Sequence, residues 1–145
     1  MRRRASRPDS PAAIRSGDDE EHDIDDDLRA VFTAAAAADA KSGTDTVVLD
    51  VGDMLGITGY FVITSGGNGR LVRSLSDEIE RVVGETCDIK PRRVEGLDSL
   101  RWVLLDYGDF VAHVFHDEDR AYYDLEHLWS EVPRLDWRAA DAASA

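Results

Sequence analysis

The sequence predicts one α/β domain in which helices pack on a mixed, about five-stranded β-sheet. Short apolar runs typical of buried strands alternate with segments whose apolar residues recur at helical spacing. Two more strand-like runs, 102–105 and 110–115, are joined by the tight acidic turn Asp106-Tyr107-Gly108-Asp109, which predicts an antiparallel hairpin. With 145 residues and 43% hydrophobic content, the chain can form a single domain with its own core.

The first half of the chain is predicted to contain two helices and two buried strands. Acidic residues complement the start of the first helix, and Gly43 ends it. Asn68, in the glycine-rich turn Ser65-Gly66-Gly67-Asn68-Gly69, is expected to cap the second helix, and Gly84 to stop it. The four predicted elements, in chain order, span residues 25–40, 46–51, 60–64 and 70–83.

The second half adds the remaining strands and a helical segment. A short strand through Arg93 and Val94 is expected to lie parallel to the 60–64 strand, by a right-handed crossover. A helical segment then starts at Asp117 with an acidic first turn. An apolar patch is expected to pack back onto the sheet, and it consists of Leu125, Leu128 and Trp129.

Composition sets the boundaries of the domain and the classes of partner. Residues 1–24 are predicted to be a disordered charged extension, 25–137 the folded domain, and 138–145 a flexible tail. The 17 basic and 30 acidic residues give a net charge of -13, which disfavours nonspecific binding to nucleic acid or anionic membranes and favours a basic protein partner. A single cysteine, Cys87, excludes an intrachain disulfide and indicates a reducing, cytoplasmic setting. No apolar run approaches the length of a membrane span.

Motifs for catalysis or metal binding are weak, so no cofactor is expected. The glycine-rich turn lacks the lysine of a phosphate-binding loop. A metal-dependent transferase would need carboxylates that project to one side, which on a strand means a spacing of two. The carboxylate pairs of this chain, Asp50 with Asp53 and Asp106 with Asp109, have a spacing of three. His113 and His116 are also three apart, so we expect satisfied core or rim histidines and no zinc site.

The hairpin turn has two interpretations. Tyr107 at an exposed loop tip, flanked by Asp106 and Asp109 and with Trp102 nearby, would form a rigid recognition surface. An ordinary hairpin has the same composition, because turns favour Asp and Gly and strands favour aromatic residues. Pattern alone favours the ordinary hairpin.

Several stretches resemble the bacterial ribosomal silencing factors, the Iojap-like family. They read DTVVLDVGDMLGITGYFVITSGG, RLVRSLSDEIE, RVEGLDSLRWVLLDYGDFVAHVFH and YYDLEHLW, in order, over about 45–133. The resemblance implies a fold related to nucleotidyltransferases but without their activity. It implies a factor that binds the large ribosomal subunit through ribosomal protein L-fourteen and sterically blocks the small subunit, lowering translation when nutrients are scarce.

The resemblance also implies which residues contact the partner: Glu95, Gly96, Trp102, Asp106, Tyr107, Gly108, Asp109 and, less securely, Tyr60. The turn at 65–69 departs from the family's usual TGNSD, so no contact is carried over to it. The alternatives are a nucleotide-binding or nucleotidyltransferase-type enzyme on the same fold, and an adaptor that forms a homodimer. Neither sequence-specific nucleic acid nor membrane is expected as a partner.

Overall fold

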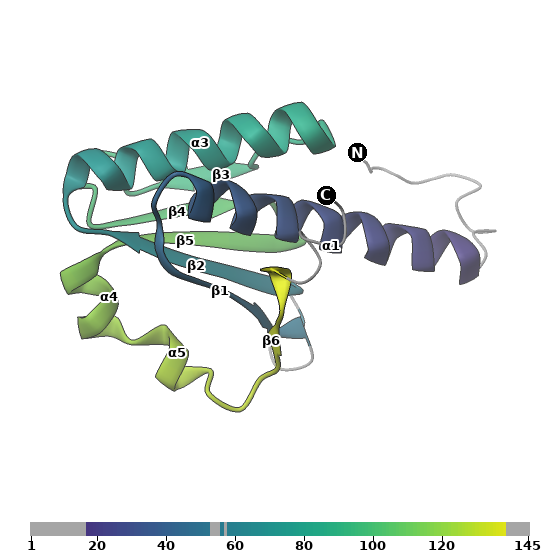
Figure 1. Ribbon diagram of the computed structural model, residues 1–145. Helices are drawn as coiled ribbons and strands as arrows, with labels where there is room; N and C mark the ends of the chain where they lie inside the picture. The colour runs from purple at the N-terminus through teal and green to yellow at the C-terminus, as the bar shows by residue number, and fades with distance from the viewer. Residues whose placement is uncertain (1–16, 53–55, 57, 139–145) are drawn as a thin grey trace.

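A computed structural model describes residues 17–52, 56 and 58–138 of the chain, with side chains from residue 26 onward. Six strands form one sheet in the order β3-β4-β5-β2-β1-β6, with helices on both of its sides (Figure 1). The elements are α1 (Gly17–Ala40), β1 (Thr44–Asp50), β2 (Tyr60–Gly66), α3 (Gly69–Cys87), β3 (Arg93–Glu95), β4 (Trp102–Asp106), β5 (Phe110–His116), α4 (Asp117–Tyr123), α5 (Leu125–Leu128) and β6 (Arg134–Leu135). The predicted α/β class with a mixed sheet is confirmed.

One strand takes a different place from the one predicted. The parallel partner of β2 is β5, whereas β3 pairs antiparallel with β4 at the edge of the sheet. The prediction that the strand at Arg93 and Val94 lies parallel to β2 is therefore wrong. The reason is burial: β3 is three residues long and largely exposed, while β5 is seven residues long and mostly buried, so β5 fills the centre. The predicted hairpin between β4 and β5 is confirmed.

Two clusters of buried side chains lie on the two faces of the sheet. On one face, α1 and α3 lie side by side over the strands and enclose the larger cluster, which includes Val62, Leu105 and Phe110 (Figure 1). On the other face, α4, α5 and the segment after them cover the smaller cluster around Phe61 and Phe115. Burial on both faces explains the near-continuous apolar runs of β1 and β2.

Helix α3 begins as predicted and ends later. Its start is capped by Asn68, whose Oδ1 accepts a hydrogen bond from the N–H of Leu71 at 2.8 Å. Gly84 does not end the helix, which continues to Cys87 and closes with Asp88 in the left-handed conformation, donating its N–H to the carbonyl of Gly84. A helical glycine costs only about 1 kcal/mol, and the buried Val83 in the same turn holds the helix on the sheet.

Helix α1 begins at Gly17, so residues 17–24 are helical and the helix starts before the predicted residue 25. The run of acidic residues from Asp18 favours a helix N-terminus through the helix dipole, whereas the lack of large apolar residues argues only against burial. Residues 1–16 and the tail 139–145 lie outside the described residues. None of the helices described is both long and apolar enough to cross a membrane.

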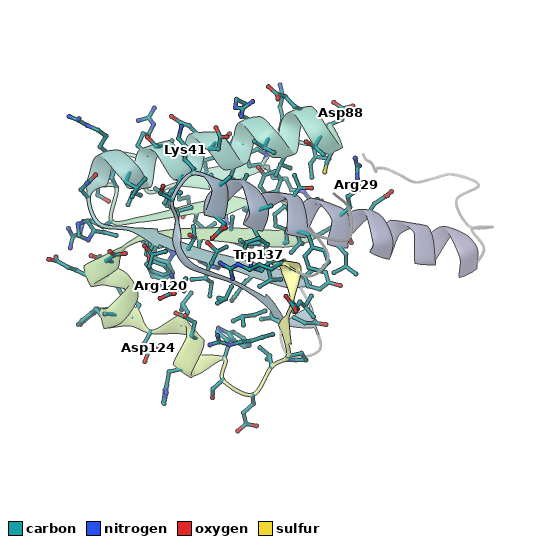
Figure 2. All side chains as sticks on the ribbon, in the orientation of Figure 1. Arg29, Lys41, Asp88, Arg120, Asp124 and Trp137 are labelled. Carbon is teal, nitrogen blue, oxygen red and sulfur yellow. The ribbon has the colours of Figure 1, made fainter. Side chains whose placement is uncertain are left out.

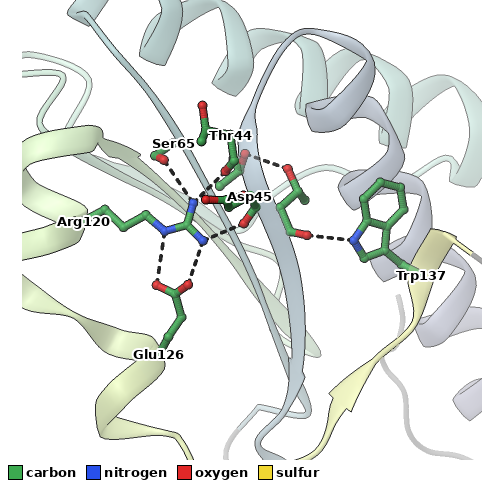
Figure 3. Close-up of polar contacts among 8 residues, drawn as sticks. Thr44, Asp45, Ser65, Arg120, Glu126 and Trp137 are labelled. Carbon is green, nitrogen blue, oxygen red and sulfur yellow. Dashed lines mark hydrogen bonds and ion pairs between the residues drawn. The ribbon is translucent and has the colours of Figure 1, made fainter.

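The C-terminal segment crosses one face of the sheet and joins its outer edge. Leu125 and Trp129 pack on the smaller cluster as predicted, whereas Leu128 is 71% exposed and does not. Leu128 is the last residue of the four-residue helix α5, and the ring of the following residue, Trp129, takes the contact with Phe61 at a centroid distance of 5.7 Å. β6, which had no apolar run to predict it, then pairs with β1. Trp137, labelled in Figure 2, donates from Nε1 to the carbonyl of Thr46 at 2.9 Å (Figure 3).

Arg120 is the polar link between α4 and the first two strands. Its guanidinium donates to the carbonyls of Thr44 (2.7 Å) and Asp45 (2.6 Å) and to Ser65 Oγ (3.0 Å) (Figure 3). Two further bonds, of 3.2 and 2.9 Å, reach the carboxylate of Glu126. With its side chain only 10% exposed, Arg120 holds the C-terminal segment against the sheet.

Candidate interaction surface

Strand β4 is buried on one side and half-exposed on the other. Val103 and Leu105 are buried, whereas Trp102, Leu104 and Asp106 alternate with them and are partly exposed. The antiparallel register places Glu95 opposite Leu104 and Arg93 opposite Asp106. We call this half-exposed group of five residues the open strip: Arg93, Glu95, Trp102, Leu104 and Asp106.

The carboxylates of the open strip are already oriented by the protein. Arg93 forms ion pairs with Glu95 at 2.8 Å and with Asp106 at 3.6 Å. Asp106 Oδ1 also accepts the N–H of Gly108 at 2.8 Å. Because Arg93 and Glu95 are more than half exposed, water and salt screen their pair, and it contributes little to stability. A cation from a partner can therefore join these carboxylates at little cost.

Trp102 is held in place by the residues around it. Its ring stacks on Phe115 at a centroid distance of 4.7 Å and meets Tyr123 at 4.8 Å. Its Nε1 donates to His113 Nδ1 at 3.1 Å, so His113 is neutral and carries its proton on Nε2. Burial lowers the pKa of His113 to about 4, which keeps the acceptor unprotonated near neutral pH. The indole of Trp102 is therefore fixed, and its N–H is not available to a partner.

Tyr107 is not at an exposed loop tip, so that part of the prediction is wrong. It is 6% exposed and stacks on Phe110 with centroids 4.6 Å apart, in the core beneath α3. Its hydroxyl is buried without a hydrogen-bond partner, and burial, with smaller contributions from Glu80 and Cys87, raises its pKa. A turn position indicates the backbone conformation and not the direction of the side chain, which here closes the open end of the core.

The other predicted contact residues divide between structural and exposed positions. Gly108 has a φ of 86° in the turn, and Gly96 has a φ of 93° at a position where an added Cβ would collide with the Trp102 carbonyl, so the backbone requires both glycines. Asp109 is exposed, and its carbonyl accepts the N–H of Gly59. Tyr60 pairs with Phe110 and packs on the larger cluster, on the face covered by α1 and α3, and burial, Asp50 and Asp27 raise its pKa. The structure thus brings Glu95, Trp102 and Asp106 together but not Tyr60 or Tyr107.

Two residues of the open strip were missed in the sequence. Leu104 lies between Trp102 and Asp106 at a spacing of two, the period that places side chains on one face of a strand. The sequence pattern placed Arg93 in a strand parallel to β2, and not beside β4. The alternation along β4 could have identified Leu104 without a structure, whereas the position of Arg93 depends on the pairing of β3 with β4.

The alternative sites considered in the sequence have structural explanations. His116 caps α4 by accepting the N–H of Glu118 at 3.2 Å, so it is a satisfied rim residue as expected, whereas Nε2 of the core residue His113 has no partner. Asn68 serves as a helix cap at the glycine-rich turn. Asp53 lies outside the described residues. Within residues 17–52, 56 and 58–138, no group of three or more His, Cys, Asp or Glu could hold a metal ion.

Fold and surface together define a single-domain α/β protein with a half-exposed sheet face edged by carboxylates. Residues 24–145 match the family model described as "Ribosomal silencing factor during starvation", and the chain belongs to this family. A ribosomal silencing factor of Bacillus subtilis is 41% identical over 103 residues, covering 71% of this chain and 86% of that protein. The chloroplast protein Iojap of Zea mays is 30% identical over 125 residues, covering 79% of this chain and 50% of Iojap.

Solved structures of similar chains agree with the fold. A crystal structure of a Chromobacterium violaceum protein superposes with a TM-score of 0.68 at 29% sequence identity, covering 71% of this chain and 85% of that one. A crystal structure from Bacillus halodurans gives a TM-score of 0.59 at 32% identity, covering 80% of this chain and 98% of that one. The predicted relation to nucleotidyltransferases finds no confirmation in these similarities.

Proposed function

We propose that this chain binds the large ribosomal subunit through ribosomal protein L-fourteen and sterically blocks joining of the small subunit. Translation is thereby repressed, especially when nutrients are limited. The observation that supports this proposal is the open strip, a half-exposed part of the sheet with an apolar centre and carboxylates at its rim, on a chain of the ribosomal silencing family. The protein acts by binding, in the cytoplasm, and requires no cofactor.

The chemistry of the open strip suits a basic protein. Leu104 and the edge of Trp102 offer apolar contact area, while Glu95 and Asp106 can accept hydrogen bonds from lysine or arginine. Charged groups at the rim of an interface mainly guide association and fix register, while apolar groups at its centre supply affinity. The net charge of -13 opposes direct contact with ribosomal RNA, so the contact is with protein.

Subunit joining, followed by light scattering, tests the proposal. Leu104→Arg places a cation at the centre of the strip and should weaken binding by about thirtyfold, which corresponds to about 2 kcal/mol. Ile89→Arg is the matched control, because Ile89 is 38% exposed and follows α3, away from the open strip, so this change should leave binding unchanged. If a folded Leu104→Arg variant still blocks subunit joining as well as wild type, the open strip is not part of the interface. Failure of the wild-type protein to block joining would refute the occlusion mechanism itself.

An assay of nucleotide turnover distinguishes the proposed binding function from the competing hypothesis of a nucleotide-handling enzyme. We expect no nucleotide turnover with Mg²⁺ or Mn²⁺, because the Asp106 carboxylate is oriented by Arg93 and Gly108 rather than toward a second carboxylate. Turnover that is lost in Asp106→Asn would support the enzyme instead. Sedimentation of the free protein tests whether it forms a homodimer off the ribosome, and gradient fractionation of cell extract tests co-migration with large subunits.

A further inference from the structure

Among the side chains that the structure describes, the most exposed aromatic one lies on α4 and not in the hairpin. Tyr122 is 81% exposed, whereas Tyr107 is buried and Trp102 is enclosed between Phe115 and Tyr123. The structure therefore provides no free aromatic anchor at either hairpin position to which the sequence assigned one. An exposed ring of this size next to a candidate interface is a marker of contact, because aromatic residues are enriched in binding sites.

Ring contacts connect Tyr122 to the open strip. The rings of Tyr122 and Tyr123 meet edge to face at 5.0 Å, and that of Tyr123 lies 4.8 Å from Trp102. Trp102 is in turn fixed by its hydrogen bond to His113. The two tyrosines therefore extend the surface of the open strip onto α4, and their position depends on a rigid support.

The charges facing outward on α4 are negative. Glu118 has a side chain 76% exposed, and Asp117 and Asp124 are also exposed. Of the two neighbouring arginines, one offsets part of this charge and the other is turned away from the surface. Arg101 pairs with Glu118 at 3.0 Å, and Arg120 points inward to the first two strands (Figure 2). Aromatic faces carry negative charge density, so tyrosine rings among carboxylates attract a cationic side chain.

We propose that Tyr122 and Tyr123 receive an arginine or lysine side chain from a protein of the large ribosomal subunit. The proposal rests on the function proposed above and adds a second contact to it. Trp102 acts here as a positioning residue that supports Tyr123, while Tyr122 makes the direct contact. Ribosomal RNA is a polyanion and is repelled by the carboxylates of α4, and a second copy of this chain brings the same charge of -13.

Binding of purified large subunits by pelleting, with variants at position 122, tests this contact. Tyr122→Ala should weaken binding by about fivefold, the size of an exposed cation–π contact, without unfolding α4, since alanine favours helix. Tyr122→Phe keeps the ring and should bind within about twofold of wild type, whereas Tyr122→Leu keeps apolar area only and should bind like the alanine variant. Ile89→Ala, an exposed apolar change on the other side of the sheet, should bind like wild type.

Each remaining outcome contradicts a defined part of the proposal. If Tyr122→Ala binds as well as wild type, Tyr122 is not a contact. If Tyr122→Leu restores binding, the surface meets an apolar group rather than a cation. If protein-free ribosomal RNA retains the wild-type protein and Tyr122→Ala abolishes that retention, the occupant is RNA. If Tyr122→Ala instead converts a wild-type dimer to a monomer, the occupant is a second copy. Wild-type protein that does not bind large subunits refutes the proposed function, and this inference with it.

Discussion

Replacing Arg120 with methionine should destabilise the folded protein strongly. The substitution removes five hydrogen bonds and leaves the Glu126 carboxylate without its partner. Removing one member of a buried ion pair costs about 3–5 kcal/mol. Because the Glu126 side chain is 21% exposed and can regain water, we expect the lower end, about 3 kcal/mol. With a urea m-value of roughly 1.5 kcal/mol/M, the unfolding midpoint should fall by about 2 M.

Urea unfolding followed by circular dichroism measures this effect, and a neighbouring arginine provides the control. Arg101 also forms two ion pairs, with Glu118 and Asp119, but its side chain is 45% exposed. Solvent screening makes such pairs weak, so Arg101→Met should unfold at nearly the wild-type midpoint. The double variant Arg120→Met with Glu126→Leu should be more stable than Arg120→Met alone, because it removes the unpaired carboxylate. Equal midpoints for Arg120→Met and Arg101→Met would refute the role assigned to Arg120.

Three further predictions concern stability. Tyr107→Phe removes a buried hydroxyl that has no partner and should raise the free energy of unfolding by about 1 kcal/mol in urea unfolding at pH 7; a decrease would show that the hydroxyl is bonded. The pKa of His113 is about 4 in the folded protein and about 6.5 in the unfolded chain. The contribution of neutral His113 to the free energy of unfolding is therefore complete above about pH 6.5. It declines by about 3 kcal/mol as the pH falls toward 4, since the unfolded chain takes up the proton first. His113→Asn should flatten this part of the pH profile, and an unchanged profile would contradict it. Gly96→Ala should lower the free energy of unfolding by about 2 kcal/mol or more, because a Cβ would collide with the Trp102 carbonyl and φ is positive there. Gly84→Ala should stabilise α3 by about 0.5–1 kcal/mol, because alanine favours helix. Thermal melting measures both effects.

Strands and helices with strong local patterns were predicted well from the sequence. The runs that became β1, β2, β4 and β5 are apolar enough to be recognised, and the cap at Asn68 follows from local chemistry. The predictions that failed concern strand pairing, which depends on the competition between strands for the centre of the sheet. No local feature of Arg93 and Val94 shows that β5 pairs with β2 in their place. The two-residue β6 has no pattern to detect, and only its pairing with β1 defines it.

Prediction of the candidate site failed mainly where side-chain direction mattered. The position of Tyr107 in a turn is visible in the sequence, but the stacking on Phe110 that buries it depends on the sheet and α3. The alternation of β4 was available and would have placed Leu104 beside Trp102 and Asp106. The contact between Trp102 and Tyr123 joins β4 to α4 and requires the tertiary structure.

The hydrogen bond between Trp137 and Thr46 has a consequence for synthesis of the chain, because these residues are 91 positions apart. At about 5–20 residues per second, translation needs roughly 5–20 s after Thr46 to produce Trp137, which belongs to the larger buried cluster. Until then β6 has not paired, and the outer edge of β1 is open to other strands. The nascent domain therefore closes late, and chaperones that shield strand edges should act before Trp137 leaves the ribosomal tunnel.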